Sequence, residues 1–235
     1  THGNAVLESQ HLTLALAAAW LVIGVVGVTR PHSLALARYV LFPAGAAVGL
    51  LLAVSALQGV FASPRAMVLP LGLPDLPFHA RTDALSSFFL LLLGAVAAGV
   101  SVFASGYLRR GEGTPPGLQC LYYHAFLASM ALVLVADDAY FFMVAWESMA
   151  LSSFFLVTSD HRHEEIRRAG YLYLLIAHLG AISILLCFGV LQGGTGDYTF
   201  QGMRELQPGA GWATAAFLLA LVGFGAKAGM VPLHV

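Results

Sequence analysis

The sequence predicts an all-α integral membrane protein, a helix bundle of about seven transmembrane helices. Apolar residues make up 59% of the 235 residues, charged residues only 10%, and the mean hydropathy is +0.81. A soluble domain carries far more polar surface than this. The apolar residues also form long runs without the alternation of a membrane β-strand, which favours helices. The net charge of −1 and the absence of a basic block give no indication of nucleic-acid binding.

Turn residues and charges divide the chain into seven apolar segments. Each holds roughly 15–25 residues, the length that crosses a hydrocarbon core about 30 Å thick. In chain order the segments cover residues 12–28, 39–61, 83–108, 121–135, 139–158, 169–191 and 212–235. The first is expected to remain as a helix rather than be cleaved as a signal peptide, because it has neither a basic start nor a small-residue cleavage site.

The connections between these segments carry little that indicates chemistry. The third helix follows "SPRAMVLPLGLPDLPFHART", a proline-rich stretch that we expect to lie along the outer surface. The sixth follows "DHRHEEIRRAG", whose metal-capable residues lack a matched second cluster, so no metal site is expected. The seventh follows the glycine-rich "GGTGDYTFQGMRELQPGAG". We expect no cofactor.

The arginines predict the orientation of the bundle. The loops after helices one, three and five hold seven of them: Arg30, Arg38, Arg109, Arg110, Arg162, Arg167 and Arg168. The loops on the other side hold three: Arg65, Arg81 and Arg204. Because basic residues concentrate in cytoplasmic loops, we expect a multi-pass protein of the cytoplasmic (inner) membrane with its N-terminus outside.

Two opposite charges remain inside the predicted helices. Glu147 lies near the middle of helix five, and Lys227, the only lysine in the chain, lies within helix seven. A charge at the bilayer centre costs at least about 2.5–3.5 kcal/mol, so such residues seldom persist without a partner or a task. One interpretation, which we favour, is a Glu147/Lys227 charge pair on an ion path. The other is a buried ion pair that only fixes the helix packing.

Glycines and a proline predict a break in helix seven. Gly225 and Gly229 flank Lys227, and Pro232, which lacks a backbone donor, follows five residues after it. These residue types weaken a helix interior. Broken helices at membrane depth line protein or water, and transporters bind ions there. The alternative is an ordinary kink with close glycine packing.

Three histidines are candidate relay residues. His178 is central in helix six, His124 lies one turn into helix four, and His234 follows Pro232. A histidine can exchange a proton near neutral pH. It can equally stay neutral and bonded to a backbone carbonyl, and for His178 both interpretations remain open.

Three stretches, "AWESMALSSFFLV", "EEIRRAGYLYLLIAHLG" and "GFGAKAGMVPLHV", resemble the antiporter-like membrane subunits shared by respiratory complex I, Mrp antiporters and energy-converting hydrogenases. The resemblance covers residues 120–235 and is closest to the hydrogenase-4 component B or formate hydrogenlyase subunit 3 type. It implies a fourteen-helix fold with a broken seventh helix. It also implies that a helix-five glutamate and a helix-seven lysine, here Glu147 and Lys227, work together in proton translocation.

On that fold the chain corresponds to the N-terminal half. Residues 1–118 would hold helices one to three with the outer loop, and residues 119–235 an incomplete first antiporter-like repeat. We therefore expect a fragment or one half of a split protein, without a complete proton path and without a redox or catalytic centre. The expected partners are the missing second half, other membrane subunits of a multi-subunit complex, and the lipid bilayer.

The resemblance leaves more than one function open. We favour proton translocation as the antiporter-like subunit of a complex I-related or energy-converting hydrogenase assembly. The alternatives are a structural membrane subunit with a packing ion pair and a cation/proton antiporter subunit of the Mrp type. A retinal protein also has seven helices and a lysine in the last one, but Gly223 stands where its carboxylate counter-ion would be, one turn before Lys227.

Overall fold

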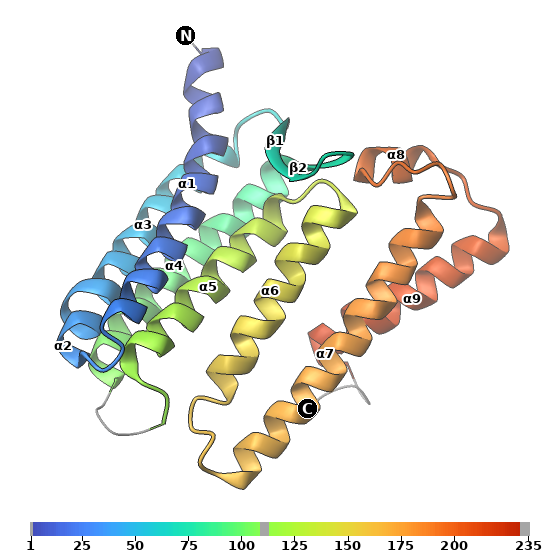
Figure 1. Cartoon of the computed structure of the whole chain (residues 1–235). Helices are drawn as coiled ribbons and strands as arrows, with labels where there is room; N and C mark the ends of the chain where they lie inside the picture. The colour runs from blue at the N-terminus through green and yellow to red at the C-terminus, as the bar shows by residue number, and fades with distance from the viewer. Residues whose placement is uncertain (1, 109–112, 231–235) are drawn as a thin grey trace.

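The computed structural model describes residues 2–108 and 113–230, and within them it confirms the predicted helical membrane fold (Figure 1). Seven helical spans in this part of the chain are long and apolar enough to cross a membrane. They are α1 (His2–Thr29), the continuous run of α2 (Leu34–Leu36), a π-helix (Ala37–Leu41) and α3 (Phe42–Gly59), then α4 (Ala84–Tyr107), α5 (Pro116–Val135), α6 (Ala139–Val157), α7 (Glu164–Leu191) and α9 (Ala210–Ala228). Four residues used in the predictions lie outside the described residues: Arg109, Arg110, Pro232 and His234.

Local signals explain where several of these helices begin. Asp83 caps α4 in a capping box, in which its carboxylate accepts a hydrogen bond from the Ser86 backbone amide at 2.9 Å. Pro116 opens α5, a position where its missing N–H costs nothing. Helix α7 begins five residues before the predicted segment because Glu164 and Glu165 occupy its first turn, where the helix dipole favours acidic side chains. A search for runs of apolar residues does not find a polar first turn of this kind.

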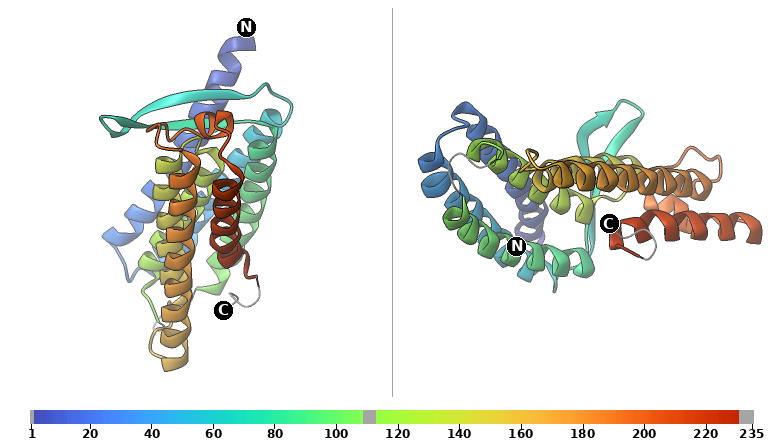
Figure 2. Two further views of the ribbon diagram at one scale, coloured as in Figure 1. Left: turned by 90° about the vertical axis from the view of Figure 1, so that its right-hand side faces the viewer. Right: turned by 90° about the horizontal axis from the view of Figure 1, so that it is seen from below.

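The proline-rich connection forms a β-hairpin, which the sequence analysis does not predict. Strands β1 (Arg65–Leu73) and β2 (Leu76–Thr82) pair antiparallel, with an irregular register between Val68 and Gly72. The hairpin lies across one end of the helices (Figure 2, left). It is fixed there because the backbone carbonyl of His79 accepts a hydrogen bond from the Asp137 amide at 2.8 Å, just before α6. The short helix α8 (Phe200–Glu205) lies at the same end (Figure 1).

The spans form a compact group followed by a row. Helices α1, α3, α4 and α5 pack around a core that includes the fully buried side chains of Trp20, Leu52 and Leu90. Seen from below, α6 and α7 extend away from this group, and α9 runs alongside α7 (Figure 2, right). Helix α9 buries only Ala216, Gly223 and Gly225 among its residues, so α7 is its main packing partner. This arrangement decides what Lys227 can contact.

Candidate functional site

The structure does not join Glu147 and Lys227, both of which it describes, in a direct ion pair. The Glu147 carboxylate instead lies 3.7 Å from the Nε2 atom of His178, measured from its Oε2 atom. The Lys227 ammonium donates a hydrogen bond to the Tyr173 hydroxyl at 3.0 Å. Helix α9 packs mainly on α7, although its Phe224 also contacts the Phe142 and Trp146 rings of α6. The side chain that accepts a hydrogen bond from Lys227 comes from α7.

The Glu147 and His178 side chains face each other between the middles of α6 and α7. The Nδ1 atom of His178 bonds to the Leu174 carbonyl at 2.9 Å. A carbonyl only accepts, so Nδ1 carries a proton and Nε2 is the atom that faces the carboxylate. In a neutral histidine with the proton on Nδ1, the Nε2 atom presents a lone pair, which repels a carboxylate. The contact is an ion pair only when His178 is protonated.

Lys227 begins a directed chain of hydrogen bonds that crosses from α9 to α6. The ammonium has only donors, so the Tyr173 oxygen accepts from it. The Tyr173 hydroxyl also contacts the Ser153 hydroxyl, and Ser153 donates to the Ala150 carbonyl at 2.9 Å. Because the serine proton is used in that bond, Tyr173 donates to Ser153. The chain therefore runs from Lys227 through Tyr173 and Ser153 to a backbone carbonyl.

A cavity of about 330 Å³ adjoins this chain. Its walls come from α5, α6, α7, α9 and the residue that ends α9, and the lining residues are Phe126, Ser153, Tyr173, Ile176, Ala177, Ala226, Lys227 and Gly229. Along α7 the lining continues from Tyr173 to Ala177, the neighbour of His178. Glu147 and His178 are not among the described residues that line this cavity.

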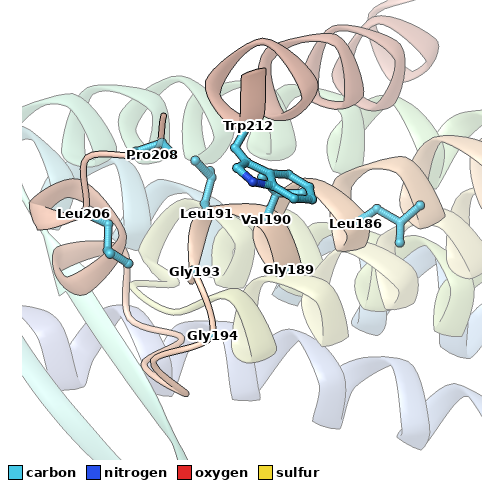
Figure 3. A pocket seen from close by; sticks show the side chains of 9 residues that line it. All are labelled: Leu186, Gly189, Val190, Leu191, Gly193, Gly194, Leu206, Pro208 and Trp212. Atoms are coloured by element: carbon cyan, nitrogen blue, oxygen red, sulfur yellow. The ribbon is translucent and has the colours of Figure 1, made fainter. Parts of the chain in front are cut away.

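A larger cavity of about 600 Å³ lies away from these groups (Figure 3). It sits between the end of α7, the connection that follows it and the start of α9, and none of the described residues that line it has an ionisable side chain. Its lining residues are Leu186, Gly189, Val190, Leu191, Gly193, Gly194, Leu206, Pro208 and Trp212. Its size alone gives it no role in moving charge.

Close packing of glycines sets the position of Lys227 against α7. A Cβ atom at Gly223 would lie 2.5 Å from Cγ1 of Ile184 and 2.8 Å from the carbonyl oxygen of Gly180. A glycine at this position lets the two backbones approach closely, as small residues do at helix contacts in membranes. The Lys227 ammonium is also 5.5 Å from the centre of the Tyr173 ring and 6.0 Å from that of Trp146, within range of cation–π attraction.

Helix α9 ends inside the interval where a break is predicted. Its last residue is Ala228, Gly229 adopts a left-handed conformation with φ of 71°, and the Met230 amide donates to the Gly225 carbonyl at 3.0 Å. This is the usual closure of a helix C-terminus by glycine. Gly225 itself stays helical, so of the predicted break residues within the described range, Gly229 is the one at which the helix ends. The course of the chain beyond Met230 belongs to residues outside that range.

His124 lies in the core of the first helices rather than at this site. Its side chain is fully buried, and its Nδ1 atom bonds to the Cys120 carbonyl at 2.8 Å. Its Nε2 atom has no hydrogen-bond partner among the residues that the structure describes. The ring fills the space beside Gly45, where a Cβ atom would lie 2.1 Å from Nε2. The structure describes no contact between His124 and Glu147, His178 or Lys227, and a relay role for it stays a prediction.

A separate ionic cluster joins the hairpin to the starts of α4 and α6. Arg81 lies 3.3 Å from Asp137 and 3.7 Å from Asp83. Burial raises the pKa of Asp137, whereas the hydrogen bond from the Ser86 amide lowers the pKa of Asp83. Within the described residues, no three His, Cys, Asp or Glu side chains come together in a group that could hold a metal ion.

Tyr173 and Trp146 are absent from the residues predicted from the sequence. A hydroxyl-bearing tyrosine within the apolar "GYLYLLIAHLG" is a weak signal, because tyrosine is common in membrane helices. Nothing in the sequence around Tyr173 indicates that its partner is Lys227, 54 residues further along the chain. Only the packing of α9 on α7 reveals that Tyr173 contacts the lysine.

Comparisons with known proteins agree with the helical membrane fold. Residues 136–235 match the family described as NADH:quinone oxidoreductase/Mrp antiporter, TM. Hydrogenase-4 component B of Escherichia coli (strain K12) is 40% identical over 154 residues, which cover 66% of this chain and 23% of that protein. NADH-quinone oxidoreductase subunit L of Mycobacterium tuberculosis is 29% identical over 178 residues, 71% of this chain and 26% of that protein.

A solved structure shows the same fold. The Mrp complex from Dietzia sp. DQ12-45-1b superposes with a TM-score of 0.73 at 24% identity, over 91% of this chain and 23% of the matched one. The chain therefore spans about a quarter of the length of the proteins it matches.

Proposed function

Because this chain belongs to the NADH:quinone oxidoreductase/Mrp antiporter family of membrane subunits, we propose that it carries part of a path that moves protons across the membrane. The observation that supports this most directly is the Glu147–His178 contact in the middle of two apolar helices. Ionisable residues are costly at that depth and are kept where they serve a pathway. A pair that takes up a proton between α6 and α7 is a suitable station on such a path.

In this proposal Lys227 carries the second charge. Five residues separate Tyr173, which holds the lysine, from His178, so the two positions are about 7.5 Å apart along α7. With a proton on His178, Glu147 is neutralised and Lys227 remains with Tyr173. When that proton leaves, the carboxylate is unpaired and attracts the ammonium. The presence or absence of a proton on His178 would then control where the charge of Lys227 lies.

The surroundings follow from the same premise. The matched proteins are named as components and subunits of complexes, so we propose that partner subunits in the membrane complete the path. We place the connection between α6 and α7 on the cytoplasmic side because it carries Arg162 and because Arg167 and Arg168 follow at the start of α7. Helices α5 to α9 would belong to the first antiporter-like repeat, and α1 to α4 would precede it.

The test is Glu147→Gln in the full-length protein within its complex, reconstituted into proteoliposomes. Glutamine keeps the shape and hydrogen bonding of the side chain but cannot ionise, so coupled proton movement should be lost while membrane insertion and assembly persist. Glu165→Gln, an exposed carboxylate in the first turn of α7, is the matched control and should pump normally. Wild-type proton movement in Glu147→Gln would leave only a structural role for this residue.

A further inference from the structure

The Tyr173 hydroxyl is arranged as an acceptor for a cation. Its own proton is directed to Ser153, whose proton is in turn directed to the Ala150 carbonyl. The lone pairs of the Tyr173 oxygen are therefore free to accept hydrogen bonds, and one of them accepts from the Lys227 ammonium. An acceptor whose donor is already committed stabilises an ammonium better than a hydroxyl that is free to rotate.

No other ionised group competes for Lys227 in the described residues around it. From α6 it meets the Trp146 ring and Ser153, and from α5 the cavity wall is Phe126. From α7 the wall continues as Ile176 and Ala177. Glu147 on α6 is directed to His178 on α7, and the other titratable group facing the ammonium is the Tyr173 hydroxyl itself.

We propose that Tyr173, held by Ser153, is a positioning residue that retains the protonated Lys227 away from Glu147 until the carboxylate loses its positive partner. The inference rests on the proposed function but makes a claim of its own, namely that the tyrosine hydroxyl sets how firmly Lys227 keeps its proton. Phenylalanine at this position would keep the ring and its cation–π contact at 5.5 Å and remove only the hydroxyl, which is the acceptor for Lys227 and the donor to Ser153.

The first experiment measures Lys227 chemically, without any transport. Only an unprotonated amine reacts with a small acylating reagent such as acetic anhydride, and Lys227 is the single lysine of these 235 residues, so peptide mass spectrometry resolves its labelling. At a fixed pH, Tyr173→Phe should raise the labelling rate of Lys227 by about ten- to a hundredfold, the effect of losing one hydrogen bond to a charged group. Ser153→Ala should raise it less, because it leaves the tyrosine oxygen in place.

The control is Tyr171→Phe, an exposed tyrosine two residues away on the same helix. Labelling of Tyr173→Phe equal to that of wild type and of Tyr171→Phe would overturn the inference, whatever Glu147→Gln does to transport. If Tyr173→Phe fails to assemble, Ser153→Ala carries the same test with the same direction. Loss of transport in Glu147→Gln together with unchanged labelling in Tyr173→Phe would leave the proposed function intact and remove the role of Tyr173.

The second experiment is the pH profile of proton movement in proteoliposomes. Tyr173→Phe should still transport, with the alkaline limb of its profile moved to lower pH by about one to two units. A merely structural tyrosine would change the rate or the yield of complex without moving the profile. Complete loss of transport at every pH in an assembled Tyr173→Phe complex would contradict a positioning role, because it would make the hydroxyl an obligatory carrier.

Discussion

The contact between Gly223 and Gly180 offers a way to displace Lys227 without touching any charged group. Gly223→Ala adds one methyl group at a point 2.5 Å from Cγ1 of Ile184 and 2.8 Å from the Gly180 carbonyl oxygen. Ordinary contacts between such atoms are about 3.5–4 Å. The isoleucine can change rotamer, but the backbone oxygen cannot swing away, so α9 must move from α7 by roughly 0.7–1 Å.

That movement is large enough to matter for both stability and function. Overpacking of this kind costs about 1–3 kcal/mol, against a gain of about 1 kcal/mol from replacing glycine by alanine in a helix. A shift of about 1 Å would also stretch the Lys227–Tyr173 hydrogen bond from 3.0 Å to about 4 Å, beyond hydrogen-bonding range. Misplacement by about 1 Å can cost up to a hundredfold in rate. We therefore expect Gly223→Ala to have a lower melting temperature than wild type and to move protons about ten- to a hundredfold more slowly.

The assay compares thermal unfolding and proton movement for Gly223→Ala and Gly211→Ala in the full-length protein. Gly211 lies in the first turn of the same helix, and no atom of the described residues lies within 4 Å of a Cβ atom placed there. Its substitution should therefore be neutral or slightly stabilising. If Gly223→Ala unfolds and pumps like Gly211→Ala, the close approach of α7 and α9 does not position the lysine.

Two further predictions concern single charges. Lys227→Arg keeps the charge and should leave assembly of the complex intact, but it should stop proton movement, because a guanidinium effectively never deprotonates. Wild-type pumping by this variant would make the lysine a packing residue. Asp83→Ala should lower stability by about 1 kcal/mol at pH 7 through loss of the α4 cap. Since the Ser86 amide lowers the pKa of Asp83 in the folded protein, that contribution is complete above the unfolded pKa of about 3.9 and is lost as pH falls through the lower folded value. Melting temperatures of wild type and Asp83→Ala should therefore converge in strongly acidic buffer, and a constant difference down to pH 2 would contradict the assignment.

The sequence locates the spans because lipid imposes a simple requirement. A chain in the hydrocarbon region must satisfy its backbone internally and cover it with apolar side chains, so the runs of Leu, Ala, Val and Phe mark the helices within a few residues. The requirement weakens at the membrane surface. The sequence therefore does not predict the polar first turn of α7 or the hairpin between Arg65 and Thr82, although the hairpin spans eighteen residues.

The same distinction applies to the site. Glu147, His178 and Lys227 are singled out because an ionisable group inside an apolar run is costly, and that cost is visible in the sequence. Their pairing is not visible, because it depends on which helix faces which. Had α9 packed on α6, the predicted Glu147–Lys227 contact would be possible. With α9 on α7, the lysine meets Tyr173, and the glutamate is left to the histidine.

The two contacts are close to balance, which is what a switch between them requires. One hydrogen bond to a charged group contributes about 1.5–3 kcal/mol. An unpaired carboxylate attracts an ammonium by about 4 kcal/mol at a separation of about 4 Å, and by about half of that at twice the separation, at the effective dielectric constant of about 20 that suits protein sites. While His178 neutralises Glu147, that attraction is absent and the Tyr173 bond holds the lysine. Once the histidine proton departs, the attraction becomes comparable to the bond and grows as the charges approach. In the proposed function, a single proton on His178 would therefore decide which partner Lys227 takes, and in the proposal for Tyr173 its hydroxyl would set the threshold.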